Sequence, residues 1–399
     1  MLTGRGLAVL GTAALLWLGS RLAGSPDLHV VSLGLLMVPL LALAYIRWSR
    51  HRLRATRRLS HRRVFAGSPV RVHLEVRNDA RSPASMLLLE DRLPRALGRA
   101  ARAVLGGLRP RTRQTVSYTL RCGRRGRFRI GPLVATVTDP FGLAQRRMEF
   151  PYVHELIVYP EVEDLRSLGP ARSVGGTGET TARRLYRSGE EFYGMRQYEL
   201  GDDLRRIHWP STARVGDLMI RQDEAGRRAT ATVFLDTRRS AYRDGDRSLE
   251  RAVSAAASVG TQFLRSGVDL RLATVDLRPR RVTPDAFLEA LALLEASGRK
   301  SLSAGMSPLQ DRSITGSSLL LVGGLPHEDD LAAILRATGS FGTKVAVLIA
   351  ESHSQERIRT ARVELARAEW RTVILPMDRP LRDVWTLGTG TRIGAAAGS

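Results

Sequence analysis

The sequence predicts a multidomain chain with an N-terminal transmembrane helical hairpin, a small antiparallel β-sandwich and a C-terminal doubly wound α/β domain. Three observations predict this order. Two apolar runs stand near the N-terminus, a middle stretch alternates apolar and charged residues, and the last part alternates strand-like with helix-like patterns. At 399 residues the chain is long enough for two or three domains, each with its own core.

The two apolar runs cover residues 6–18 and 28–46, with a short turn between them. The second run is almost uncharged and has about the length that crosses a bilayer. We therefore predict two transmembrane helices within residues 1–46. A cleaved signal peptide is the alternative interpretation of the first run. Two features disfavour it: Arg21 is an unsuitable residue near a cleavage site, and a second apolar span follows directly.

A run of arginines without any acidic residue follows Ile46, and we interpret residues 47–63 as a basic juxtamembrane segment. By the positive-inside rule this flank stays in the cytoplasm. The predicted location is thus the cytoplasmic membrane, multi-pass, with the soluble domains in the cytoplasm. Each arginine near the surface adds roughly 1 kcal/mol of attraction to an anionic leaflet, so anionic lipid is a predicted partner of this flank.

Strict alternation begins at Pro69, where valine and leucine face one way and charged residues the other, as in a half-buried antiparallel strand. Short strands separated by Gly and Pro predict a small β-sandwich over residues 64–160. The turn Asp139-Pro140-Phe141-Gly142 is predicted to be a structural corner with the phenyl ring packed beneath it. The predicted strands cover residues 70–77, 87–90, 115–120, 127–130 and 133–138.

Residues 161–187 are rich in Gly, Ser and Thr and are predicted to form a flexible linker. The stretch GGTGET at residues 175–180 has the glycines of a phosphate-binding loop. A Walker motif also needs a Lys-Ser or Lys-Thr pair that opens a helix, and no lysine lies near this stretch. The linker interpretation is therefore preferred.

A continuous apolar strand at residues 230–236 opens the predicted α/β domain, which we extend over 230–399. It ends in Asp236, as central parallel strands often end in a polar residue at the ligand-binding edge. Helix and strand patterns then alternate, which predicts a doubly wound sheet with any ligand outside the carboxyl ends of its strands. The later predicted elements are helices at 249–265, 284–296, 328–337 and 355–368 and strands at 269–275, 318–322, 344–349 and 371–375.

Residues 188–229 contain the densest mixture of charged, aromatic and turn residues. Arginines and acidic residues share this segment, so bidentate ion pairs are available at many combinations and are expected to make it rigid. Gly201 and Asp202 predict a turn that opens a helix, and Pro210 is predicted to end it at Trp209.

The stretch GEEFYGMRQYELGDDLRRIHWPSTAR resembles the signature of the domain of unknown function 58 (DUF58) family. That signature is an Arg-x-Tyr, a Gly-Asp, an Arg, a hydrophobic-x-Trp and an Ala-Arg. RRGRFRIGPL at 124–133 with DPFGL at 139–143 resembles the upstream landmark of the same family. The predicted interaction residues of the signature are Glu191, Arg196, Tyr198, Gly201, Asp202, Arg205, Ile207, His208, Trp209, Ala213 and Arg214.

The resemblance implies a membrane-anchored protein with a von Willebrand factor A-like C-terminal domain, often a neighbour of a MoxR-type AAA+ ATPase, and no settled activity. In von Willebrand A domains the metal site resembles Asp-x-Ser-x-Ser, whereas this chain has Asp236-Thr237-Arg238-Arg239-Ser240. Arg238 brings a cation where Mg²⁺ needs oxygen ligands, and residues 322–325 offer no carboxylate. We interpret Asp236 and Ser240 as positions of a degenerate metal site and predict no metal and no cofactor.

These observations predict an interaction module or adaptor that works with a MoxR-type AAA+ ATPase in assembly or envelope-related processes. A membrane-bound enzyme that uses the acidic and histidine motif around Asp202 and His208 is one alternative, but no recognised catalytic spacing is present. The net charge of +23 suggests a second alternative function, which is nonspecific binding of nucleic acid or anionic lipid. No basic stripe interleaved with aromatic residues appears, so no specific nucleic-acid partner is expected.

Overall fold

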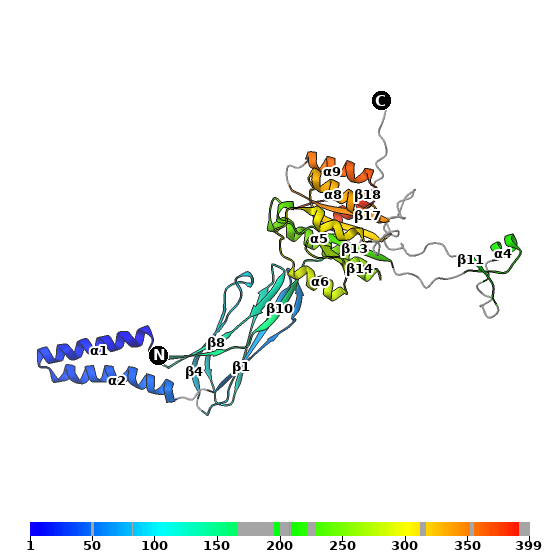
Figure 1. Cartoon of the computed structure of the whole chain (residues 1–399). Coiled ribbons are helices and arrows are strands. Elements are labelled where there is room, and N and C mark those ends of the chain that lie inside the picture. The colour runs from blue at the N-terminus through cyan, green and yellow to red at the C-terminus, as the bar shows by residue number, and fades with distance from the viewer. Residues whose placement is uncertain are drawn as a thin grey trace. The chain divides into compact units, whose positions relative to one another are not determined.

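The computed structural model describes residues 1–48, 52–81, 83–165, 195–199, 207, 209–221, 229–311, 317–351 and 355–390. Its chain divides into two compact units, Met1–Tyr159 and Pro160–Ser399 (Figure 1). Each unit has its own core and is described by itself below.

The first unit begins with two apolar helices, α1 (Gly4–Ala23) and α2 (Pro26–Trp48), which pack against each other (Figure 1). Thr3 caps α1, because its hydroxyl oxygen accepts a hydrogen bond from the Gly6 amide at 3.2 Å. Gly24 ends α1 in the left-handed conformation that a non-glycine residue rarely adopts. Both helices are long and apolar enough to cross a membrane. The prediction of two N-terminal apolar helices is confirmed.

The rest of the first unit is β-rich and contains three sheets in its described residues. Their strand orders are β1-β3-β6, β2-β10-β7 and β5-β4-β8-β9. Alternate apolar residues of all three sheets, together with Ala42 and Ile46 of α2, meet in one core. The strands are β1 (Leu53–Leu59), β2 (Arg63–Phe65), β3 (Pro69–Asn78), β4 (Ala84–Asp91), β5 (Ala101–Leu108), β6 (Arg113–Arg121), β7 (Gly126–Ile130), β8 (Leu133–Thr138), β9 (Gln145–Phe150) and β10 (His154–Tyr159).

Every strand predicted between residues 70 and 138 is present, but the unit differs from an all-antiparallel sandwich in two ways. β2 pairs with β10 in parallel, so one sheet is mixed. The segment 47–63, predicted as a basic juxtamembrane region, contains β1, which pairs antiparallel with β3. Arg57 occupies one of the inward positions of β1 and is buried. The charged side chain of Arg57 therefore lies in the interior of this unit and does not face a lipid surface.

The predicted corner at Asp139 is a turn, but its ring is not packed beneath it. Phe141 is 72% exposed. The interior is filled instead by Leu143 and Ala144, which are buried. The Asp139 carboxylate holds the turn by accepting hydrogen bonds from the amides of Phe141, at 2.9 Å, and Ala144.

The second unit is built on a six-stranded sheet in the order β15-β14-β13-β16-β17-β18. All neighbouring pairs are parallel except β14–β15 at one edge. This is the 3-2-1-4-5-6 order of doubly wound sheets, with the order reversing beside β13. The strands are β13 (Thr230–Leu235), β14 (Asp269–Thr274), β15 (Arg280–Arg281), β16 (Ser318–Gly324), β17 (Thr343–Ala350) and β18 (Trp370–Pro376).

Helices cover both faces of this sheet. One core gathers apolar side chains of α7, α8 and α9 on Phe234, Leu321 and Leu348. Successive strand residues point to opposite faces, so Val233 and Val322 face the other way, toward the side where α5 contacts the strands. The helices are α5 (Asp246–Arg265), α6 (Pro284–Leu293), α7 (Leu302–Met306), α8 (Glu328–Ala337), α9 (Gln355–Arg367) and α10 (Leu381–Gly390).

Two other findings bear on the sequence predictions. Residues 161–165, predicted as the start of the linker, pack on α5: Ser254 donates a hydrogen bond to the Glu161 carbonyl at 2.9 Å, and the Glu163 amide donates to the Ser258 hydroxyl at 2.9 Å. Pro210 lies in the first turn of α4 (Trp209–Val215), where its missing amide hydrogen costs nothing. The helix predicted to open at Gly201 and Asp202 lies outside the described residues.

Candidate functional site

The carboxyl edge of the second sheet is the place where a doubly wound fold usually holds a ligand. Asp236 follows β13 directly, and Asp330 lies in the first turn of α8, which follows the neighbouring strand β16. An acidic residue suits that position because the amino end of a helix carries partial positive charge. The topology therefore brings both carboxylates to one point of the edge.

The guanidinium of Arg238 lies between these two carboxylates. Nη2 is 2.8 Å from Asp236 Oδ2 and 2.9 Å from Asp330 Oδ2, and Nη1 is 2.9 Å from Asp330 Oδ1. Nε adds a hydrogen bond of 3.0 Å to Asp236 Oδ1. The side chains are almost fully enclosed, 4% exposed for Arg238 and 7% for Asp236. Arg238 thus forms bidentate pairs with both acids, the strongest geometry available to an arginine and a carboxylate.

Backbone contacts hold Arg238 in this position. Its amide donates to Asp236 Oδ1 at 3.0 Å, and Nη1 donates to the Lys300 carbonyl at 3.0 Å. The next amide, that of Arg239, donates to the Ser297 carbonyl at 3.0 Å, and the Tyr242 hydroxyl donates to the Asp236 carbonyl. Hydrogen bonds therefore hold the loop after β13 in place, from Asp236 at its start to Tyr242 at its end.

Two glycines at the end of β16 allow this loop to approach the sheet. A Cβ atom on Gly324 would lie 1.9 Å from the Ala241 carbonyl oxygen, and one on Gly323 would lie 3.0 Å from Asp236 Cβ. The first distance is far shorter than any real contact, so glycine is required there. The cavity left beside Arg238 measures about 10 Å³, close to the room that one water molecule needs. The guanidinium of Arg238 therefore fills the carboxyl edge of the sheet at this point.

The ionisation of this cluster follows from its burial and its partners. Burial raises the pKa of the Asp236 carboxyl, although the hydrogen bonds from Arg238 act in the opposite direction. Burial alone would lower the pKa of Arg238, but Asp236 and Asp330 outweigh it and raise the pKa above its ordinary value. Arg238 therefore stays charged, and the cluster is a buried cation between two acids.

The two residues assigned to a degenerate metal site have different surroundings. Asp236 is buried in the cluster, whereas Ser240 lies in a short turn and is exposed. The acid that completes the cluster, Asp330, was missed by the sequence analysis. It stands in the run Glu328-Asp329-Asp330, where acids at a helix start are ordinary, so only its place after β16 could have singled it out.

The signature segment is only partly described. Met195–Gln197 form β11, which pairs antiparallel with β12 (Met219–Arg221), and α4 lies between them in the sequence (Figure 1). Tyr198 donates its amide to the Leu218 carbonyl at 2.8 Å. The structure brings Arg196, Tyr198, Trp209, Ala213 and Arg214 into this small substructure, and Ile207 precedes α4. The predicted site residues outside the described part are Glu191, Gly201, Asp202, Arg205 and His208.

Trp209 is the most prominent side chain of the described signature residues, because it is 67% exposed at the start of α4. Val215, the last residue of α4, and Leu218, three residues beyond it, are exposed as well. No residue of α4 with a described side chain is buried. This substructure therefore presents apolar side chains to its surroundings.

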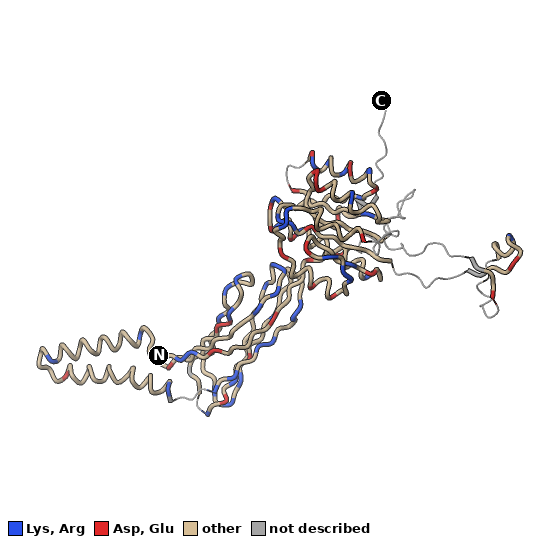
Figure 2. Tube along the Cα trace, in the orientation of Figure 1, with Lys and Arg blue, Asp and Glu red and all other residues tan. Residues whose placement is uncertain are grey.

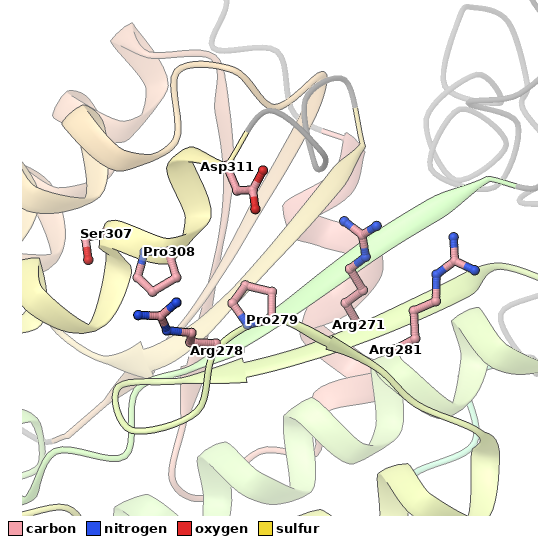
Figure 3. Close-up of a pocket in the computed structure, with 7 residues that line it drawn as sticks. All are labelled: Arg271, Arg278, Pro279, Arg281, Ser307, Pro308 and Asp311. Carbon is pink, nitrogen blue, oxygen red and sulfur yellow. The ribbon is translucent and has the colours of Figure 1, made fainter.

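Figure 3 shows a hollow at the β15 edge of the sheet, of about 520 Å³. Arg271 and Arg281 lie on adjacent antiparallel strands and extend to the same side, with Arg278 nearer to Pro308 (Figure 3). The hollow is wide and basic, but its arginines lie at the surface, so it lacks the enclosure of a small-molecule site.

A second buried ion pair lies in the first unit. Arg57 Nε donates to Asp91 Oδ2 at 2.9 Å, and Nη2 pairs with Asp91 Oδ1. The Tyr118 hydroxyl donates to Asp91 Oδ2 at 2.6 Å, and burial followed by this hydrogen bond raises the pKa of Tyr118. Burial and the charges of Arg57 and Arg62 lower the pKa of His154. Arg57 Nη1 also donates to the Ile130 carbonyl of β7 at 3.0 Å. These contacts therefore join strands from all three sheets and stabilise the β-rich body.

Comparison with known proteins finds a similar sequence in Bacillus subtilis. "Uncharacterized protein YeaD" of Bacillus subtilis (strain 168) is 22% identical over 329 residues, which cover 78% of this chain and 79% of that protein.

Two solved structures show the level of structural likeness found. The CARDB domain of the PF1109 protein from Pyrococcus furiosus has a TM-score of 0.21 at 14% identity and covers 27% of this chain and 93% of that chain. The alkylpurine DNA glycosylase AlkC of Pseudomonas fluorescens has a TM-score of 0.20 at 9% identity and covers 33% of this chain and 39% of that chain. Likenesses at this level establish neither fold nor function.

The signature segment and the α/β unit match a family model together. The family model described as "Protein of unknown function DUF58" matches residues 194–384 of this chain, a range that includes β11 and ends within α10.

Proposed function

We propose that this chain is a membrane-anchored interaction module that serves as an adaptor for a MoxR-type AAA+ ATPase in assembly or envelope-related processes. The observation that carries the proposal is Arg238, which fills the ligand edge of the sheet between Asp236 and Asp330. A side chain that closes this edge leaves little room for a substrate there. Binding through a surface is therefore favoured over catalysis at this edge.

Membrane anchoring is supported by α1 and α2, which are long and apolar enough to span a bilayer. Within the first unit, Thr3 just before α1 bonds to the turn at Leu143, and Ile46 near the end of α2 is buried in the β core. Both ends of the hairpin thus contact the same β-rich body. A two-span hairpin places that body on one side of the membrane, and the basic flank after Ile46 favours the cytoplasmic side, with anionic lipid as a further partner.

A von Willebrand A-like character of the second unit is part of the proposal. Support comes from the doubly wound order of its sheet and from Asp236 directly after the first central strand. In this interpretation the guanidinium of Arg238 stands where a divalent cation would otherwise join the two acids. The permanent cation would hold the loop after β13 in one conformation without metal.

The surface proposed for the ATPase is the signature substructure. Exposed tryptophan is enriched among the residues that dominate binding energy at interfaces, and Trp209 is exposed at the start of α4. Val215 and Leu218 add apolar area of the same substructure. Arg214, in the last turn of α4, would contribute to the polar rim.

Replacing Trp209 with serine is expected to weaken capture of a purified MoxR-type AAA+ ATPase by the full chain at least tenfold, since a hot-spot residue contributes about 2 kcal/mol or more. Tyr152→Ser is the matched control, because Tyr152 is also aromatic and 65% exposed but lies in the other unit. Pulldown from detergent micelles, with ATPase activity measured on the eluate, gives the readout. Equal capture by both variants and the unchanged chain would contradict this surface.

The topology is tested by reporter fusions after Ser399. A fluorescent reporter that matures only in the cytoplasm is expected to be active there, and an alkaline phosphatase, which needs an oxidising compartment, is expected to be inactive. A fusion between α1 and α2, after Gly24, should give the reverse pattern. Active phosphatase after Ser399 would overturn the cytoplasmic placement.

A further inference from the structure

The first three residues of the chain are bonded to the turn that joins β8 to β9. Met1 exchanges two backbone hydrogen bonds with Gln145, of 2.9 and 2.8 Å. The Thr3 amide donates to the Leu143 carbonyl at 2.8 Å, and the Thr3 hydroxyl donates to the Gly142 carbonyl at 2.6 Å. The residue that caps α1 and the turn of the β-rich body are therefore held together by direct bonds.

The turn itself is fixed. Asp139 accepts hydrogen bonds from two amides of the turn, and its carbonyl accepts one from the Gly142 amide at 3.0 Å. Gly142 has φ of 73°, a conformation that glycine adopts without strain. The helix also fits closely, since a Cβ on Gly6 would lie 2.3 Å from the Leu143 carbonyl oxygen. Phe141 is held outward by a framework that leaves its ring exposed.

This inference rests on the proposed membrane anchoring. When α1 crosses a bilayer, its first turns, where Thr3 bonds to the β8–β9 turn and Val9 packs against the β core, lie at the headgroup side of the span. Each headgroup layer is roughly 5–8 Å thick. Gly142, next to Phe141 in the chain, is bonded to Thr3, so the Cα of Phe141 lies one residue step, about 3.8 Å, from a residue held at that side of the span.

We propose that the turn Asp139–Leu143 is a lipid-contact site in which the ring of Phe141 enters the bilayer interface. An exposed aromatic ring at this depth exchanges water for apolar surroundings, which burial of apolar area favours. The ligand class is therefore the phospholipid surface itself. The site fixes the β-rich body to the membrane at the start of α1, in addition to the covalent connection after α2.

Basic residues at the same end of the unit agree with a headgroup surface. Arg52 follows the end of α2 by four residues, at most about 14 Å of chain. Its carbonyl accepts from the Asp79 amide at 2.8 Å, and the Arg111 amide donates to the neighbouring Asn78 carbonyl at 2.8 Å. Figure 2 shows basic residues at the end of the β-rich body nearest α2, as well as along the rest of that body. Exposed arginines there suit anionic phosphates.

The test places a nitroxide spin label at residue 141 of the full chain in phosphatidylcholine–phosphatidylglycerol nanodiscs. Cys122 is the single cysteine and is buried, so Phe141→Cys in a Cys122→Ala background gives one labelled position. Power saturation compares collisions with oxygen, which concentrates in lipid, and with a water-soluble nickel chelate. The ratio of oxygen to nickel collisions is expected to be severalfold higher at residue 141 than at a water-exposed position.

Tyr152→Cys supplies the water-exposed control, since Tyr152 is similarly exposed but follows the far end of β9. Five residue steps from Gln145 to Phe150 span about 17 Å. Leu15→Cys in the middle of α1 tests the anchoring separately. A water-like ratio at residue 141 with a lipid-like ratio at residue 15 would overturn the contact site alone. Water-like ratios at both positions would instead overturn the membrane anchoring on which it rests.

Discussion

Replacing Asp91 with alanine is expected to lower the free energy of unfolding of the first unit by about 3–5 kcal/mol. The substitution leaves the cation of Arg57 without a carboxylate in a site where the two side chains are 2% and 0% exposed. It also removes the acceptor of the Tyr118 hydroxyl, which donates to Asp91 at 2.6 Å. A buried charge and a buried hydroxyl would both lose their partner, and each carries a desolvation cost.

The neighbouring residue provides a matched control. Glu90 lies on the same strand, β4, and pairs with Arg102 at 3.2 Å on the exposed side. Glu90→Ala should cost no more than about 1 kcal/mol, because solvent screens an exposed pair. Urea titration of the full chain in detergent, with pulse proteolysis to follow the first unit, measures both losses. Similar small losses in the two variants would show that the Arg57–Asp91 pair does not stabilise this unit.

Arg57 also shows why the sequence analysis misplaced the start of the β-rich body. Residues 53–59 do alternate, with Leu53, Ala55, Arg57 and Leu59 on the inner side. One of these inner positions holds an arginine, in a stretch where many other arginines face outward. The many arginines therefore obscured β1 in the sequence, although its two-residue alternation was present. The buried partner of Arg57, Asp91, lies 34 residues further along the chain. No local sequence pattern predicts that the two residues pair.

The α/β unit was more predictable because its signals are local. β13, β16 and β17 are nearly continuous apolar runs, as buried parallel strands are, and α5 and α8 carry their apolar residues at helical spacing. The cluster at the sheet edge depends instead on tertiary contacts. Arg238 and Asp330 are 92 residues apart and meet only because β13 and β16 are neighbours. Arg238 was recognised from the sequence as the residue that makes the metal site degenerate, but its pairing with Asp330 was not predicted.

The Phe141 turn illustrates a third kind of limit. The sequence DPFG predicts a turn, and a turn is present, but a ring in a turn is not necessarily packed inward. Its direction is set by Asp139, whose carboxylate binds two amides of the turn, and by Leu143, which takes the interior position. Contacts with Met1 and Thr3, at the other end of the unit in sequence, complete the arrangement.

Replacing Arg238 with serine is expected to destabilise the second unit by about 3–5 kcal/mol at neutral pH, because Asp236 and Asp330 then face each other without a cation. The loss should depend on pH. Burial raises the pKa of Asp236, and loss of the hydrogen bonds from Arg238 would raise it further. A carboxyl whose pKa is raised by folding binds more protons in the folded state, so its contribution to stability is lost as pH rises through that pKa. The defect should therefore be smaller at pH 5 than at pH 8.

The same variant tests whether Arg238 stands in for a metal ion. Serine removes the cation and adds an oxygen beside two carboxylates, the ligand type that Mg²⁺ and Mn²⁺ prefer. Millimolar Mg²⁺ at pH 8 should raise the melting temperature of Arg238→Ser, because a ligand that binds only the folded state stabilises it. The unchanged chain and the control Arg239→Ser, altered at the exposed neighbouring arginine, should not respond. Calorimetric binding of Mg²⁺ by the unchanged chain, abolished by Asp236→Ala, would show that the guanidinium does not occupy the cation position.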